Sequence, residues 1–81
     1  RMGKFEEAIT HLQRALDNQA DHPVILDHLG DAYEEHGQLD TAIRYWKKVL
    51  EVGPQYPLEF TSDFHFRVVQ KIQAAENSIK Q

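Results

Sequence analysis

The chain has 81 residues, no cysteine and a formal net charge of −4. A domain of this size buries only about 60% of the surface that its unfolded chain exposes, and without cysteine it has neither disulfides nor thiolate metal sites. The acidic balance argues against a nucleic-acid partner, because such a binder needs a basic surface. No apolar run reaches the roughly 20 residues that cross a bilayer, so we expect no membrane insertion.

The first predicted element is a helix from Lys4 to about Asn18. Its apolar residues are spaced by three and four positions, which places them on one helical face. They are Phe5, Ala8, Ile9, Leu12, Ala15 and Leu16. Asp21 or His22 can cap the next helix, and Pro23 suits its first turn, where no backbone N–H is needed.

Two further helices follow at short intervals. The second contains the apolar residues Ile25, Leu26, Leu29, Ala32 and Tyr33, and the third contains Ala42, Ile43, Trp46, Val49 and Leu50. Gly37 is a typical C-terminal glycine for the second helix, and the third extends from near Leu39 to Gly53. Because the connections are short, we expect neighbouring helices to pack antiparallel.

The last predicted element is one longer helix, which Thr61, Ser62 or Asp63 can cap. Pro54 and Pro57 favour an extended connection before it. Its apolar stripe consists of Phe60, Phe64, Val68, Ile72, Ala75 and Ile79, widened by Phe66 and Val69. Its polar side consists of Gln70, Gln73, Glu76, Asn77 and Lys80, which we expect to face water. We interpret this helix as a cap on the preceding helices, and the alternative is a degenerate repeat.

An internal repeat relates the first and third helices. Five identical pairs are each separated by 34 residues: Gly3 and Gly37, Ala8 and Ala42, Ile9 and Ile43, Leu16 and Leu50, and Pro23 and Pro57. Other positions are conservative at the same offset, such as Leu12 with Trp46. A fixed period of this length indicates a stack of similar helical units.

A family resemblance rests on residues within this period. They are Leu26, Leu29, Gly30 and Tyr33, followed by Ala42, Trp46 and Pro54. Together they resemble the tetratricopeptide repeat pattern, in which Leu26 stands where the family usually has tryptophan. The resemblance covers about the first two-thirds of the chain.

The resemblance implies an all-α fold, an antiparallel helix-turn-helix repeat stack of the α-solenoid type with a C-terminal capping helix. Residues 1–22 are then the second helix of a truncated repeat, residues 23–56 a complete repeat, and residues 57–81 the capping helix. Gly30 and Ala42 are small residues, and we expect that they allow two helix backbones to approach closely. Bulky rings then fill the remaining space.

The resemblance also implies a function, that of a non-catalytic interaction scaffold. In this family the first helices of the repeats line a groove that holds a peptide or a partner helix. The matching face here consists of Val24, Asp27, His28, Asp31 and Glu34. Because this face is acidic, we expect a basic or neutral protein or peptide as its partner. The alternative is a solvated acidic face that only keeps the protein soluble.

Self-association is the second functional hypothesis. Phe5, Ile9 and Leu12 lie on an apolar face whose usual partner helix is missing from the sequence. Apolar surface in water is unfavourable by about 25 cal/mol per Å², so we expect a homo-oligomer, or a C-terminal helix that folds back over this face.

Catalysis and metal binding find no support in the sequence. Five histidines are present, but no pair has the spacing that places two imidazoles on one helical turn. Ser62 and Ser78 do not lie in a nucleophile motif. We therefore expect no catalytic residue, no metal site and no cofactor. The run from Ile25 to Tyr33 resembles bacterial repeat proteins, some of them attached to the cell envelope, which leaves the cytoplasm and the envelope both open.

Overall fold

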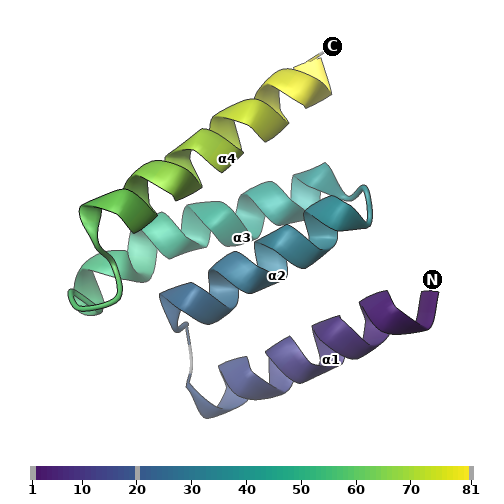
Figure 1. Ribbon diagram of the computed structural model, residues 1–81, viewed down its shortest axis with the longest axis horizontal. Coiled ribbons are helices and arrows are strands. Elements are labelled where there is room, and N and C mark those ends of the chain that lie inside the picture. The colour runs from purple at the N-terminus through teal and green to yellow at the C-terminus, as the bar shows by residue number, and fades with distance from the viewer. Residues whose placement is uncertain (1, 20, 81) are drawn as a thin grey trace.

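Four α-helices follow one another in the computed structural model, which describes residues 2–19 and 21–80. They are α1 (Met2–Asn18), α2 (Pro23–Glu35), α3 (Leu39–Val52) and α4 (Ser62–Lys80), with a short 3₁₀ helix, η1 (Gly53–Gln55), after α3. Within these residues there is no strand. Consecutive helices lie side by side and antiparallel, with α1 and α4 at the two edges (Figure 1). The prediction of an all-α antiparallel stack closed by a C-terminal helix is confirmed.

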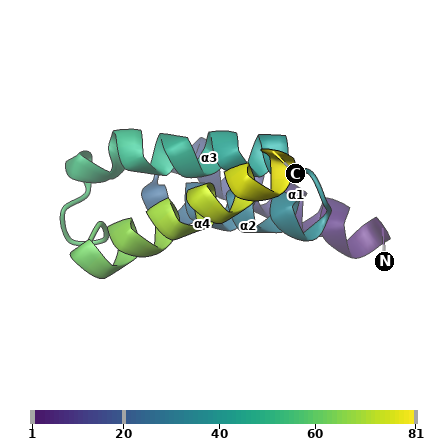
Figure 2. The same cartoon turned by 90° about the horizontal axis from the view of Figure 1, so that it is seen from above.

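The helices form two levels. Seen from above, α2 and α4 lie at one level and α3 at the other (Figure 2). The molecule is correspondingly thin, with extents of 35 × 32 × 16 Å. Helices α2 and α4 therefore share one face of the protein, and the candidate site lies on that face.

Side-chain caps start two of the helices where the sequence predicts them. The Nδ1 atom of His22 accepts a hydrogen bond of 3.3 Å from the N–H of Val24, and Pro23 occupies the first turn of α2. At α4, the hydroxyl of Thr61 accepts a 3.2 Å hydrogen bond from the N–H of Phe64. Each cap satisfies a backbone donor that has no partner within its own helix.

Helix α2 ends in a glycine turn. Gly37 has a φ of +84°, a left-handed conformation that glycine adopts without strain. Its N–H donates to the carbonyl of Glu34 at 2.9 Å, and the N–H of Gln38 donates to the carbonyl of Tyr33 at 2.9 Å. This pair of bonds is a Schellman motif, which reverses the chain and sets α3 antiparallel to α2.

The connection between α3 and α4 is not extended, so that prediction is wrong. Residues 53–55 form η1, and the N–H groups of Tyr56 and Phe60 donate to the carbonyls of Gly53 and Tyr56 at 2.8 and 2.9 Å. The φ angle that proline fixes suits the first turn of a helix as well as an extended chain. The ring of Phe60 also lies directly against Gly53, which has no side chain to block it.

The hydrophobic core lies between α2, α3 and α4. Its buried apolar side chains are Leu26, Leu29, Ala42, Ile43, Trp46, Val49, Val52, Val68, Ile72 and Ala75. Trp46 is the largest of them and is 0% exposed. Apart from Val52, each of these residues belongs to the apolar stripe that the sequence predicts for its helix.

The space beside Gly30 is filled by a side chain of α3. A Cβ atom added at Gly30 would lie 2.5 Å from Cδ1 and 2.9 Å from Cε2 of Trp46. The atoms nearest to this position belong to the indole ring and not to a neighbouring backbone. The small residue on α2 therefore makes room for a ring of α3, because the largest core side chain needs a position without a side chain opposite it.

Helix α4 buries a narrower stripe than predicted. Val68, Ile72 and Ala75 are buried, whereas Ile79 is 48% exposed and Phe66 is 62% exposed. Ile79 lies in the last full turn of α4, beside the start of α3, where fewer side chains remain to cover it. Phe66 lies on the opposite side of α4 from its buried stripe and does not widen the buried face.

We expect Gly30→Ala to lower the free energy of unfolding by roughly 1–3 kcal/mol. Overpacking of a dense core has this cost, which outweighs the ~1 kcal/mol advantage of alanine over glycine in a helix. Urea unfolding followed by circular dichroism measures the change. Adding Trp46→Leu removes the ring, so the double variant should lose less than the sum of the two single losses. Additive losses would contradict a clash with the indole.

Candidate functional site

A groove of about 360 Å³ lies between α2 and α4. Val24, Asp27 and His28 contribute to it from α2. From α4 and the residues before it come Glu59, Thr61, Phe64, Arg67, Val68 and Lys71. The lining of the groove therefore combines apolar and charged side chains.

The structure thus places three of the five predicted binding residues in one groove. Asp31 lies one turn beyond Asp27 on α2 and is half-buried. Glu34 is exposed nearer the end of the helix and does not line the groove. The sequence predicted the contribution of α2 but not that of α4.

Lys71 of α4 forms an ion-pair cluster with α2. Its Nζ atom lies 3.0 Å from Oδ1 of Asp27 and 2.9 Å from Oδ1 of Asp31. The same ammonium is 5.8 Å from the ring centroid of Trp46, within the range of a cation–π contact. One side chain thus joins α4 to α2 above the main core residue of α3.

The sequence contains one indication of this contact, a lysine beside the apolar stripe of α4, but only the packing of the helices identifies its partners. Lys71 follows Val68 by three positions and directly precedes Ile72, so it lies beside the buried stripe of α4. A lysine at such a position needs an anionic partner. Two aspartates one turn apart on α2 supply it, but no local pattern pairs residues that are 44 and 40 positions apart.

The cluster changes the pKa values of its members in a consistent way. Burial raises the pKa of Asp27 above its ordinary value, although the hydrogen bond from Lys71 opposes this. Burial also lowers the pKa of Lys71, but the hydrogen bonds to Asp31 and Asp27 outweigh it, so that pKa lies above its ordinary value. The Lys71 ammonium therefore stays charged, and the Asp27 carboxylate depends on it.

This pairing weakens the expectation of a strongly acidic groove. Asp27 and Asp31 both contact Lys71, and Arg67 adds a second cation to the wall of the same groove. Glu59 is the remaining carboxylate of the lining, and its Oε2 lies 4.0 Å from Nε2 of His22. The groove surface therefore carries charges of both signs.

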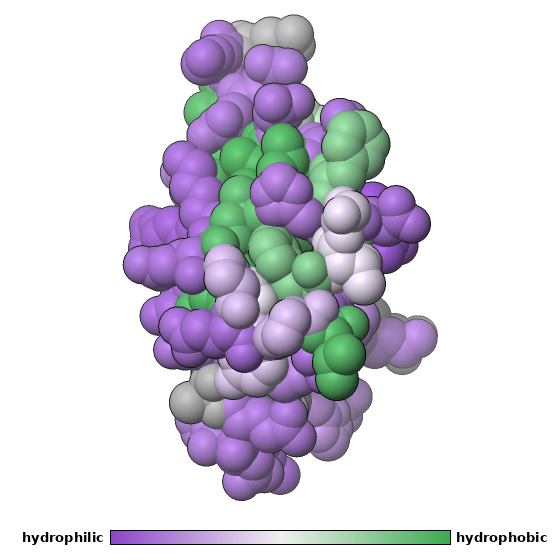
Figure 3. All heavy atoms as spheres, turned by 90° about the vertical axis from the view of Figure 1, so that its left-hand side faces the viewer, coloured by the Kyte–Doolittle hydropathy of each residue, from purple (hydrophilic) through white to green (hydrophobic). Residues whose placement is uncertain are grey.

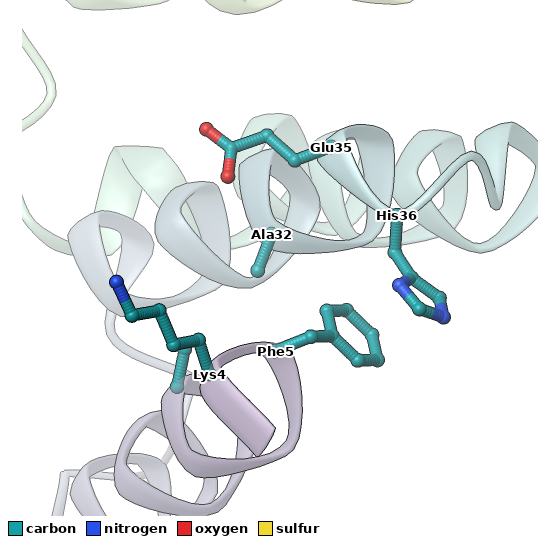
Figure 4. Close-up of a pocket in the computed structure, with 6 residues that line it drawn as sticks. Lys4, Phe5, Ala32, Glu35 and His36 are labelled. Atoms are coloured by element: carbon teal, nitrogen blue, oxygen red, sulfur yellow. The ribbon is translucent and has the colours of Figure 1, made fainter. Parts of the chain in front are cut away.

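A second cleft of about 280 Å³ lies between α1 and α2. In Figure 4, Lys4 and Phe5 reach into it from α1 and face Ala32, Glu35 and His36. The rings of Phe5 and His36 are stacked, with centroids 3.8 Å apart and planes 9° apart. Phe5 therefore packs against the end of α2.

The other residues predicted for self-association are also half-buried. Ile9 and Leu12 follow Phe5 along α1 and are neither fully covered nor fully exposed. Farther along, Nε2 of Gln13 donates a 3.2 Å hydrogen bond to the hydroxyl of Tyr45, which joins α1 to α3. Helix α2 thus covers part of the predicted apolar face.

Within residues 2–19 and 21–80, no three histidine or acidic side chains gather where they could hold a metal ion. In the same part of the chain, every helix is too short or too polar to cross a membrane.

Comparison with known proteins gives one match. The model of the tetratricopeptide repeat family matches residues 1–55, which is more than half of the chain. The match extends from α1 to η1 and ends before α4. No curated protein and no solved structure matches the chain.

We expect Lys71→Met to destabilise the protein by roughly 1–3 kcal/mol near neutral pH, because it leaves a buried carboxylate without its partner. The loss should shrink as the pH falls through the raised pKa of Asp27. As the pH falls, this carboxyl binds a proton in the folded state before it does so in the unfolded chain, which favours the folded state. The neutral carboxyl no longer requires the Lys71 ammonium as a partner. Urea unfolding at about pH 7 and about pH 4 measures both values.

Lys47→Met is the matched control. Lys47 is 60% exposed and lies 3.2 Å from Glu76, so its removal should change stability by less than ~1 kcal/mol. If Lys71→Met lowers the free energy of unfolding by the same amount at both pH values, the Asp27 carboxylate does not depend on Lys71 as we propose.

Proposed function

Because the chain belongs to the tetratricopeptide repeat family, whose repeats generally mediate protein–protein interaction, we propose that it binds a segment of another protein in the groove between α2 and α4. The repeats of this family typically serve as non-catalytic modules, and we propose the same role here. In this proposal residues 23–56 are the complete repeat, residues 1–22 belong to a preceding one, and residues 57–81 complete the groove.

The observation that carries the proposal is the composition of the groove. Val24 and Phe64 provide apolar surface between two antiparallel helices, and His28 and Arg67 provide polar groups beside it. Ligand sites in proteins combine apolar walls with a few polar groups in this way. A groove bounded by two helices fits an extended peptide or a helix placed along it.

The ion-pair cluster defines the chemistry of the ligand that we propose. Lys71 already neutralises much of the charge of Asp27 and Asp31. A cationic side chain of a ligand is therefore attracted to this site less strongly than the two aspartates in the sequence indicate. We therefore favour a neutral segment over a basic one. Its apolar side chain would lie against Phe64, and its backbone groups would bond to the polar rim.

A photo-crosslinking amino acid at His28 tests the proposal. His28 is exposed, so its replacement leaves the core intact. We expect a crosslinked protein partner in native extract, identified by mass spectrometry. The same amino acid at Arg44, an exposed position on α3, is the matched control and should give no such product.

A second substitution in the groove makes the test specific. A Phe64→Gln variant that carries the crosslinker at His28 removes apolar surface from the groove and should reduce the yield of the same product several-fold. Equal yields from the His28 and Arg44 positions, or a yield that the Phe64 change leaves untouched, would refute binding in this groove.

A further inference from the structure

Asp27 is the one buried charged side chain among the described residues, and it lines the groove between α2 and α4. Its side chain is 12% exposed, whereas that of Asp31, one turn later, is 38% exposed and does not line the groove. Burial disfavours the charged form of a carboxyl group, so the charge of Asp27 depends on the groups that surround it.

Lys71 pairs with two carboxylates at once, which leaves the cluster with an excess negative charge. Its Nζ atom is 3.0 Å from Oδ1 of Asp27 and 2.9 Å from Oδ1 of Asp31, so one positive charge faces two negative ones. When Asp27 binds a proton, the pair between Lys71 and Asp31 remains and the cluster as a whole becomes neutral. Asp27 takes this proton before Asp31 does, because its side chain is the more deeply buried of the two.

The remaining groups around Asp27 do not remove this excess charge. Burial, the largest influence, raises the pKa of Asp27, and His28 of the same helix lowers it. Among the described residues, no charged side chain of α1 or α3 acts on that pKa. Arg67 and Glu59 also line the groove, but their charges have opposite signs, and the ion pair of Asp27 is with Lys71.

We propose that the groove binds its partner more tightly in mildly acidic solution than at neutral pH, with Asp27 as the group that accepts the proton. This inference rests on the proposed function, in which a neutral segment of another protein lies in the groove. Such a segment covers Asp27 and brings no positive charge, so the complex favours the neutral form of the cluster. Binding therefore takes up a proton, and by linkage a lower pH strengthens binding.

The direction and the size of the effect follow from the uptake of one proton. The partner raises the pKa of Asp27 further, so the affinity rises as the pH falls from the pKa in the complex to the pKa in the free chain. Since one proton is bound for each partner, the affinity changes by at most about tenfold per pH unit. The bond between Lys71 and Asp31 persists, so α2 and α4 stay joined while the charge of the groove changes.

The end of the molecule at which α2 and α4 begin offers the partner further apolar surface. Figure 3 shows this end, with apolar residues gathered along its middle between hydrophilic ones. Leu58, which directly precedes Glu59 of the groove lining, is 88% exposed. A partner that covers this surface as well as the groove keeps water away from Asp27.

NMR of the side-chain carboxyl carbons tests the first part of the proposal without a partner. We expect the pKa of Asp27 in the free chain to lie above that of an aspartate in an unstructured peptide. Lys71→Met should raise it further, and Asp31→Asn should lower it, because the second negative charge is then absent. An Asp27 that titrates at or below the peptide value would refute the proposal.

Crosslinking from His28 tests whether binding responds to this proton. The crosslinker also removes the histidine next to Asp27, and the probe is the protein that it captures from native extract. We expect the yield of this product to be at least about threefold higher at about pH 5.5 than at about pH 7.5. Asp27→Asn is the matched variant, since its amide oxygen still accepts a hydrogen bond from Lys71 but carries no charge. It should give similar yields at both pH values.

The outcomes separate this inference from the proposed function. A product with equal yields at both pH values refutes the pH dependence but leaves binding in the groove intact. A yield that rises equally with Asp27→Asn assigns the titration to another group and refutes the inference as well. If no product forms at either pH, the proposed function fails and the inference fails with it. Asp27→Ser takes the place of Asp27→Asn if circular dichroism shows that the latter does not fold.

Discussion

The contact between Trp46 and Gly30 is the constraint on which the rest of the structure depends. The indole of α3 occupies the space that a side chain at Gly30 of α2 would need, so each residue is possible only because of the other. This contact sets the distance between α2 and α3, and α4 then packs Val68, Ile72 and Ala75 onto the same core.

The Lys71 cluster connects this core to the candidate groove. Lys71 pairs with two aspartates of α2, and its ammonium also lies near the ring of Trp46. The arrangement of α2 and α4 is therefore stabilised both by packing in the core and by ion pairs between the two helices. A charge pair across two helices also defines their register, which hydrophobic contacts specify less sharply. The groove that we propose as a binding site is therefore lined in part by groups that hold α2 and α4 together.

The two edges of the molecule differ in the same physical terms. At the α1 edge, Ala8 is exposed and lines the cleft with α2, and at the α4 edge, Phe66 is 62% exposed on the side away from the buried stripe. The groove between α2 and α4 is lined by neither of these two side chains.

The sequence by itself determined the helices, their caps at His22 and Thr61, the turn at Gly37 and the core position of Trp46, because these depend on periodicity and on local backbone chemistry. It also indicated which face of α2 would contribute to a site. Only the tertiary structure decided that Gly30 faces a ring, that Lys71 neutralises Asp27 and Asp31, and that α4 forms half of the groove. These features join residues that are far apart in the chain, and the angle and register at which helices pack depend on the shapes of both partners, which no local pattern contains.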